Sequence, residues 1–327
     1  MKFEAVAPES EFEHIRDGWA KAALKQFDPF CSLPEWQLAF HEAFSPKRRL
    51  LVKYAFGSML CFAEKVFSPS DIYLTPIEPH WFFGNPLLGE HSVDLLVKAM
   101  EFITVEYCPQ FPKILISGVE PKGLLQQQLL SAFGKDFRIN LFFTSLQCAA
   151  SLAGGVDGFL SRRSANFRSK LKKACKRASA VGVNFERVIP TSQEEASIIY
   201  SRMLSVEKMS PQGIFNDLPI PKFYAAVNRR LSRQADARII MARHGGKDIG
   251  FISGGMANSI YRGLQSSYDD EWKTYSIGNI LHFEQIKWLC EESADRYDMG
   301  EIKPHMRYKE HWTEMRIPSL CLRLEKK

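Results

Sequence analysis

Four side chains in the second half of the chain could move a proton. Tyr268 and Asp298 each follow a predicted strand, Lys309 lies in a basic-aromatic segment, and Glu207 closes a predicted helix. A phenol can protonate a leaving group, and a carboxylate can accept a proton from a nucleophile. Because carboxylate–ammonium pairs are more often structural than catalytic, Asp298 and Lys309 could instead form an ion pair. Glu207 could equally be a solvated residue of a last helical turn.

The segment Tyr275-Ser276-Ile277-Gly278-Asn279 could hold a phosphate. The first turn of a helix offers unpaired N–H groups and a partial positive charge, which suit an anion. Ser276 could cap this helix, and Gly278 would let a ligand approach the backbone. An ordinary capped helix would show the same residues. A helix is predicted because apolar residues recur at helical spacing: Ile280, Leu281, Phe283, Ile286 and Leu289.

A strongly basic segment lies near the middle of the chain. Residues 162–177 contain eight basic and no acidic side chains, whereas the whole chain has a net charge of +6. Phe167, Leu171 and Ala178 recur at helical spacing, so the segment predicts an amphipathic helix. Its charges could form a solvated face, or could bind an RNA backbone, an acidic carrier protein or an anionic lipid. With Phe167 as the one aromatic residue, base reading and sequence-specific DNA binding are not expected.

The hydrophobic periodicity predicts an α/β chain in which helices cover a mixed sheet. Ser10 with Glu13, and Thr191 with Glu194, predict capping boxes at two helix starts. A loop with three prolines is predicted at 210–221. The predicted strands are 49–55, 59–67, 72–77, 113–119, 138–147, 183–189, 237–244, 248–256, 260–267, 296–299 and 316–322. The predicted longer helices are 10–24, 92–107, 122–133, 156–163, 166–180, 191–207 and 222–234.

Residues 149–158 contain three glycines and three alanines and are the predicted hinge. They divide the chain into predicted domains at 1–152 and 153–327, each of ordinary domain size. The two parts show a similar order of helices and strands, although their sequences are not alike. We therefore infer a topological repeat.

Composition limits the class of protein. Seven scattered cysteines without a Cys-x-x-Cys pair favour a reducing compartment over a disulfide framework or a zinc ribbon. The eight histidines form no His-Glu-x-x-His, so no metal site is expected. The acidic N-terminus is not typical of a signal peptide, and the longest uncharged run, 139–156, is too polar for a transmembrane segment. We expect a cytoplasmic protein.

The run from Gly250 to Trp312 resembles the C-terminal half of a GNAT-type acyltransferase domain of the CelD/Fem-like branch. From Tyr268 it reads Y-D-D-E-W-K-T-Y-S-I-G-N-I-L, where that branch has Y-D-x-x-W-x-x-Y-S-x-G-x-x-L. It continues with Tyr297-Asp298-Met299-Gly300 and with Tyr308-Lys309-Glu310-His311-Trp312, which resemble Y-D-x-G and Y-K-x-x-W. A basic helix similar to 162–177 recurs in the same branch.

The resemblance implies two tandem GNAT-like domains, the first of which can be a degenerate copy. It implies an N-acyltransferase in which an amine attacks an acyl-CoA, an acetyl-CoA by default, without a metal. The catalytic candidates stay Asp298, Lys309, Tyr268 and Glu207. A splayed strand at 262–267 would carry the pantetheine. The implied donor-binding residues are Gln265, Ser266, Ser267, Tyr275, Ser276, Gly278 and Asn279, and the implied substrate-binding residues are Tyr308 and Arg168.

The phosphate-binding turn departs from the common GNAT pattern. That pattern is Q/R-x-x-G-x-G/A, whereas this chain has one glycine, Gly278, followed by Asn279. A carrier-protein thioester or an aminoacyl-tRNA therefore stays open as the donor, with the basic helix 162–177 as its contact. A catalytically inactive GNAT-fold binding protein is the third interpretation. The acceptor is not specified by the sequence.

Overall fold

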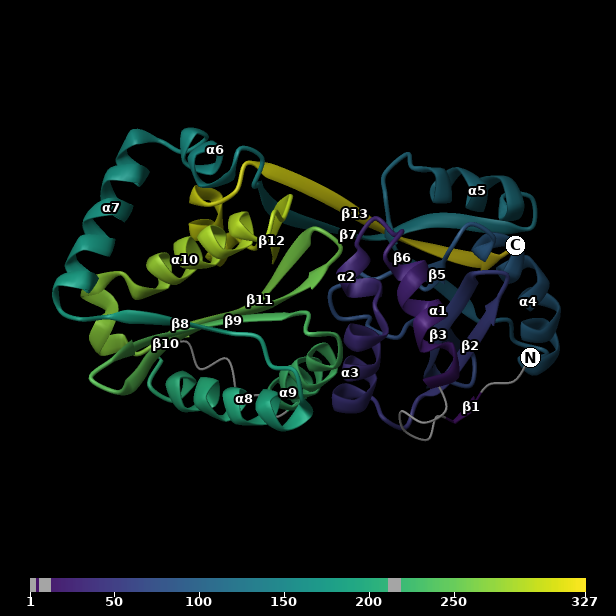
Figure 1. The fold of residues 1–327 in the computed structure, drawn as a ribbon. Coiled ribbons are helices and arrows are strands. Elements are labelled where there is room, and N and C mark those ends of the chain that lie inside the picture. The colour runs from purple at the N-terminus through teal and green to yellow at the C-terminus, as the bar shows by residue number, and fades with distance from the viewer. Residues whose placement is uncertain (1–3, 6–12, 211–218) are drawn as a thin grey trace. The chain divides into compact units, whose positions relative to one another are not determined.

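The computed structural model describes residues 4–5, 13–210 and 219–327 (Figure 1). These residues divide into two compact units. Unit 1 comprises residues 1–146 together with 318–327, and unit 2 comprises residues 147–317. The predicted cap at Ser10 and most of the predicted proline loop lie outside the described residues. Residues 318–327 return to unit 1, which no feature of the sequence indicated.

Unit 1 contains a mixed sheet in the order β1-β2-β3-β4-β6-β13-β7. Leu51 of β2 packs in a core cluster with Leu96 of α4 and Leu129 of α5. The neighbouring Leu50 points to the other face and is also fully buried, so helices cover both faces. The elements are β1 (Glu4–Ala5), α1 (Glu13–Ala23), α2 (Pro29–Ser32), α3 (Pro34–Phe44), β2 (Arg49–Ala55), β3 (Ser58–Ser68), β4 (Asp71–Pro76), β5 (Leu87–Leu88), α4 (Ser92–Glu106), β6 (Lys113–Val119), α5 (Leu124–Phe133), β7 (Phe137–Ser151) and β13 (Met315–Lys326).

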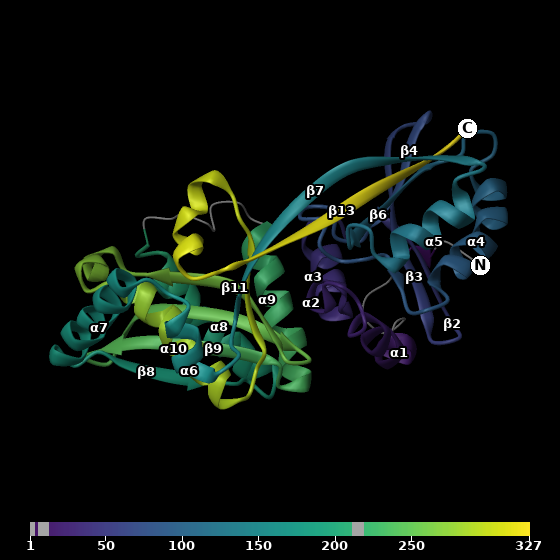
Figure 2. The same ribbon diagram turned by 90° about the horizontal axis from the view of Figure 1, so that it is seen from above.

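Unit 2 contains the second mixed sheet, in the order β7-β12-β11-β10-β9-β8. Helices α10, α6 and α7 cover one face, and α8 and α9 cover the other (Figures 1 and 2). The elements are α6 (Gly155–Ser161), α7 (Ala165–Ala180), β8 (Asn184–Val188), α8 (Gln193–Glu207), α9 (Pro219–Leu231), the 3-10 helix η3 (Ser232–Gln234), β9 (Ala237–His244), β10 (Lys247–Ala257), β11 (Ile260–Tyr268), the 3-10 helix η4 (Asp270–Tyr275), α10 (Ile277–Glu291), β12 (Arg296–Glu301) and the 3-10 helix η5 (Pro304–His311).

The predicted mixed α/β architecture is confirmed, with local corrections. The predicted hinge begins too early, because Ala149 and Ser151 belong to β7 and pair with Asp298 and Arg296 of β12. The cap of α8 is one residue later than predicted. Ser192 Oγ accepts the N–H of Glu195 at 3.1 Å, and the Glu195 carboxylate accepts the N–H of Thr191 at 2.7 Å.

Each unit contains one parallel strand pair that soon separates. In unit 1, β4 pairs with β6 only at Tyr73↔Lys113 and Leu74↔Ile114. In unit 2, β11 pairs with β12 from Ile260↔Arg296 to Arg262↔Asp298. Beyond Arg262, the register within the described residues pairs β11 with β10 alone. The edge of β11 from residue 263 to 268 is therefore open on the side of β12.

Candidate active site

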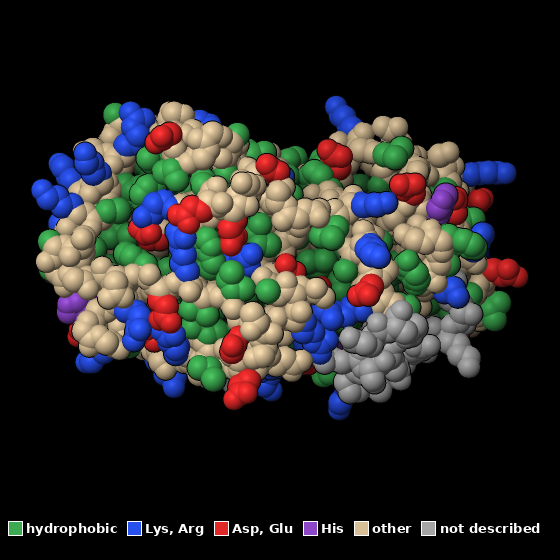
Figure 3. All heavy atoms as spheres, in the orientation of Figure 1, with side chains coloured by type: hydrophobic (Ala, Val, Ile, Leu, Met, Phe, Trp, Pro, Cys, Tyr) green, Lys and Arg blue, Asp and Glu red, His purple; other side chains and the backbone are tan. Residues whose placement is uncertain are grey.

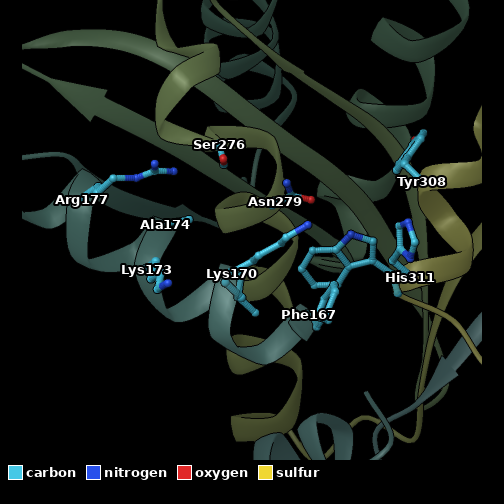
Figure 4. Close-up of a pocket in the computed structure, with 11 residues that line it drawn as sticks. Phe167, Lys170, Lys173, Ala174, Arg177, Ser276, Asn279, Tyr308 and His311 are labelled. Atoms are coloured by element: carbon cyan, nitrogen blue, oxygen red, sulfur yellow. The ribbon is translucent and has the colours of Figure 1, made fainter. Parts of the chain in front are cut away.

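A cavity of about 430 Å³ opens in unit 2 between α7, the start of α10 and η5 (Figure 4). We call it the cationic pocket, because three of its side chains are cations and none is a carboxylate. In Figure 4, Lys170 and Arg177 extend from α7 toward Asn279 and Ser276 at the start of α10. The lining residues are Phe167, Lys170, Leu171, Lys173, Ala174, Arg177, Ser276, Asn279, Tyr308, His311 and Trp312.

Helix α7 supplies the charge of the pocket. It begins at a side-chain cap, since Ser164 Oγ accepts the N–H of Phe167 at 3.2 Å. Leu171, Ala174 and Ala178 are buried against the core of unit 2, which leaves the lysines and arginines exposed. Figure 3 shows Lys and Arg side chains gathered over this helix. The sequence predicted the basic helix, but not that Lys170, Lys173 and Arg177 form its pocket-lining side.

The start of α10 is built by backbone geometry rather than by a side-chain cap. Ser276 has φ 61°, and its carbonyl accepts the N–H groups of Asn279 at 3.0 Å and of Ile280 at 3.2 Å. Within the described chain, the Ser276 side chain makes no capping hydrogen bond, so the predicted cap is wrong. The first N–H groups of a helix have no partner inside it, which here concerns Ile277 and Gly278, between the pocket-lining residues Ser276 and Asn279.

Gly278 serves a different purpose from the predicted one. A Cβ at this position would lie 3.0 Å from Cε1 of Tyr268, so the side of the helix that the glycine leaves open is filled by the Tyr268 ring. Tyr268 is therefore half-buried where β11 ends against the first turn of α10. Tyr275 lies before that turn and packs on Trp272, with ring centroids 5.2 Å apart.

The closing segment 303–312 supports the pocket from the other side. Trp312 is buried, and its ring lies 5.0 Å from Phe167 and 5.3 Å from His282 between centroids. Its carbonyl accepts a hydrogen bond from Arg163, which also donates to Glu314 Oε2 at 2.6 Å. Tyr308 is 48% exposed and lines the pocket, and its role in binding a substrate stays a prediction. Trp312 is thus part of the core, whereas Tyr308 is partly exposed at the pocket.

The predicted ion pair between Asp298 and Lys309 is not formed in the described part of the chain. Lys309 Nζ donates to the carbonyl oxygens of Met299 at 2.7 Å and Glu301 at 2.6 Å. Asp298 Oδ1 accepts the N–H of Gly300 at 2.7 Å, and Oδ2 lies 3.3 Å from Arg262 Nη2. Both side chains are buried and hold β12 by these contacts, so we assign them positioning roles, and their catalytic roles stay predictions.

Burial shifts the pKa values of Lys309 and of the neighbouring His282. Desolvation lowers the pKa of the Lys309 ammonium, while the Cys148 thiol and the Asp298 carboxylate act in the opposite direction. Burial also lowers the pKa of His282 to about 3, helped by the charge of Lys309. His282 is therefore neutral near pH 7, with Nδ1 2.7 Å from the hydroxyl of Tyr297.

The remaining predicted residues fall in different places. Arg168 is not at the pocket, because its Nη1 donates to the carbonyl of Arg163 at 2.6 Å, just after α6. Glu207 is not solvated as its position suggested: it is 5% exposed. Gln265, Ser266 and Ser267 lie along the open edge of β11, where the first and last are buried.

The corresponding opening in unit 1 is filled by its own chain. The loop after β4 runs into the space beside β6, where Gly118 donates its N–H to the carbonyl of Phe82 at 3.3 Å. Ser117 donates to the carbonyl of Gly84, and a Cβ on Gly118 would lie 2.6 Å from the carbonyl oxygen of Phe83. A cavity of about 330 Å³ remains beside Gly118, but the described residues that line it include two carboxylates, Glu90 and Glu120, and one cation, Lys25, so the candidate anion site is the one in unit 2.

No helix in the described ranges is long and apolar enough to cross a membrane. The described residues also contain no group of three or more His, Cys, Asp or Glu side chains placed to hold a metal ion.

Comparison with known proteins shows which folds this chain is similar to. None of the curated proteins is similar to the chain in sequence. A solved structure of FemX superposes with a TM-score of 0.66 at 12% identity, covering 98% of this chain and 97% of that one. A conserved protein of unknown function from Bacteroides thetaiotaomicron VPI-5482 gives 0.62 at 10% identity, covering 99% of both chains. The C-terminal domain of a putative lysylphosphatidylglycerol synthetase from Agrobacterium fabrum gives 0.60 at 10% identity, covering 96% of this chain and 92% of that one.

These superpositions and a family model agree. The likeness to FemX extends over both units. Residues 165–310 match the family model described as an acetyltransferase (GNAT) domain, and they contain the whole of α7, β11, α10 and β12. Residues 165–310 are therefore similar to an acetyltransferase (GNAT) domain, and the chain as a whole has a fold like that of FemX.

Proposed function

We propose that unit 2 transfers an acyl group, acetyl by default, from acyl-CoA to an amine. The observation that carries this proposal is the cationic pocket, where Lys170, Lys173 and Arg177 face the start of α10. A pyrophosphate suits this place, because cations and unpaired helical N–H groups stabilise the same anion. The pocket contains no carboxylate that would repel it.

The open edge of β11 gives the rest of the donor a place to lie. A pantetheine arm that extends from the pocket along residues 263–268 could accept backbone hydrogen bonds there, as an added strand would. An N–H of this edge would polarise the thioester carbonyl where negative charge develops. Gln265, Ser266 and Ser267 are the residues that would flank the arm.

The reaction is a direct transfer. The amine attacks the thioester carbonyl, the carbon–nitrogen bond forms, the carbon–sulfur bond breaks, and the amine's proton leaves to a base. We propose Glu207 as the base, since it is buried on α8 beyond Met203 and Val206, which pack on the sheet. We propose Tyr268 as the acid for the leaving thiolate, because it joins the end of β11 to the first turn of α10.

Charge reversal in the pocket tests the donor site. The double variant Lys170→Glu/Lys173→Glu should abolish the rise in melting temperature that acetyl-CoA gives by binding the folded state. Lys172→Glu/Lys176→Glu is the matched control, because both residues are exposed on the same helix and do not line the pocket. A panel of acyl-CoA thioesters that leaves the wild-type melting temperature unchanged would disprove the CoA donor.

An aminoacyl-tRNA is the second candidate donor, and one observation favours it. Lys172 and Lys176 extend the cationic surface of α7 beyond the pocket, farther than a single CoA needs. Each phosphate contact that releases counterions steepens the salt dependence of binding. For tRNA, Lys172→Glu/Lys176→Glu should weaken binding and flatten its salt dependence. Unchanged tRNA affinity in this variant would exclude aminoacyl-tRNA as the donor. Binding of either donor without any acyl transfer would indicate a catalytically inactive binding protein.

A further inference from the structure

A row of polar side chains lies on the face of the unit 2 sheet opposite the cationic pocket. Gln265 pairs with Ser253 of β10, and Ser267 pairs with Phe251. Phe251 packs with Met203 and Val206 of α8, so its side chain lies on the α8 face of the sheet. Ser267 pairs with Phe251, and Ser253 and Gln265 each lie two residues away along their strands. All three polar side chains therefore lie on the α8 face. Tyr268 points the other way, since it pairs with Gly250, which contacts α10.

These side chains are buried without hydrogen bonds. Ser253 and Ser267 are each 1% exposed, and Gln265 is 9% exposed. Among the described residues, nothing pairs with the two hydroxyl oxygens or with Gln265 Oε1. Buried polar groups in folded proteins are nearly always paired, so three neighbouring exceptions on two adjacent strands require a reason. A ligand that supplies the missing partners is such a reason.

A β-bulge extends the row along β11. Gly254 pairs with Gly263 while Ser253 pairs with Gln265, so Leu264 is the extra residue. The bulge turns Arg262 to the same face as Gln265. Arg262 does not make this surface cationic, because it donates to Gln147 Oε1 at 2.9 Å and lies 3.3 Å from Asp298 Oδ2. The row therefore offers neutral hydrogen-bonding groups rather than net charge.

We propose that Ser253, Gln265 and Ser267 bind the acceptor, and that the acceptor is an amine carrying hydroxyl or amide groups. The proposal rests on the proposed function and adds its substrate class. The donor would enter on the α10 face and the acceptor on the α8 face, and both would meet at the open edge of β11. Gln265 Oε1 can only accept a hydrogen bond, so it selects a ligand with N–H or O–H groups. An apolar amine would leave all three groups unpaired.

The acceptor site can be tested without any donor. Glucosamine and cyclohexylamine are matched rings with and without hydroxyls, and diglycine supplies an amide instead. We expect glucosamine or diglycine to bind the full chain in calorimetric titration and cyclohexylamine to bind at least tenfold more weakly. Binding of glucosamine but not diglycine would identify a sugar acceptor, and the reverse would identify a peptide. Equal binding of cyclohexylamine, or no binding of either polar amine, would overturn the proposal.

Variants separate a binding role from a structural one. Gln265→Leu, Ser253→Ala and Ser267→Ala should each weaken the polar amine at least tenfold, while the two serine variants keep or raise the melting temperature of the ligand-free protein. Ser117→Ala is the control, because Ser117 is equally buried but donates to the carbonyl of Gly84, so its loss should lower the melting temperature. Unchanged amine affinity in all three site variants would refute the proposal, whereas loss of CoA binding alone would refute only the proposed function.

Discussion

Lys309 Nζ lies 2.7 Å from the carbonyl oxygen of Met299 and thereby holds β12 where it separates from β11. It also donates to Glu301 at 2.6 Å, next to Gly300, which has φ 72°. The ammonium thus satisfies two carbonyl groups at the bend of the strand. These contacts connect the Tyr308-Lys309-x-x-Trp312 motif to the shape of the open edge of β11.

Replacing Lys309 by Met should lower the free energy of unfolding by about 2–3 kcal/mol, because two buried carbonyls lose a charged donor. Urea unfolding measures the change. Lys303→Met is the control: Lys303 pairs with Glu301 Oε2 at 2.9 Å on a partly exposed side chain, and such pairs contribute at most about 1 kcal/mol. Equal losses in the two variants would contradict the assignment.

His282 should make stability depend on pH. Its pKa is lowered to about 3 from 6.5, so between these values the unfolded state binds more protons than the folded state. Stability contributed by the neutral ring is present above pH 6.5 and is lost as pH falls toward 3, by up to about 1.4 kcal/mol per pH unit. His282→Gln should flatten this part of the urea-unfolding profile. A profile that His282→Gln does not alter would rule out this contribution.

The bulge in β10 and β11 depends on Gly254. A Cβ there would lie 2.2 Å from the carbonyl oxygen of Arg262 and 2.4 Å from the Tyr261 ring, so both strands would have to move apart. Gly254→Ala should therefore destabilise the protein by at least about 2 kcal/mol. Gly263→Ala, whose nearest contact is 3.1 Å from a ring carbon of Tyr297, should cost less. Thermal unfolding of the two variants compares them, and the reverse order would contradict the register.

Removing residues 318–327 should destabilise unit 1 rather than unit 2. Strand β13 pairs with β6 through Leu320↔Val119 and Leu322↔Ile116, and Leu322 and Leu324 are buried in the unit 1 core. Hydrogen exchange should show lost protection in β6 while β10 stays protected. Uniform loss of protection in both strands would indicate that the two units unfold together.

The sequence predicted most elements, because their periodicity and turn residues are local. The strands 49–55 and 237–244 begin and end at the predicted positions, and the helix after Ser276 begins where it was predicted. Thr191 and Ser192 both suit an N-cap, so the choice between them depended on where the α8 backbone turns, which spacing does not reveal.

The site was only partly predictable, because its key partners are distant in sequence. The sequence indicated both Ser276–Asn279 and the basic helix, but not that they face each other across one cavity. Asp298 and Lys309 lie in one motif, yet Asp298 pairs with Arg262, 36 residues away by their numbers, across a parallel register. The bulge at Leu264, which brings Arg262 and Gln265 to one face, leaves no mark in the residue pattern.

The course of β13 has a consequence for biosynthesis. Residues 13–146 leave the ribosome long before residues 318–326, which belong to the same unit and contain the part of β13 that pairs with β6. While unit 2 is being translated, the edge of β6 that will pair with β13 therefore stays unpaired. A ribosome stalled anywhere between these points would carry a nascent chain that chaperones should recognise by that unfinished edge.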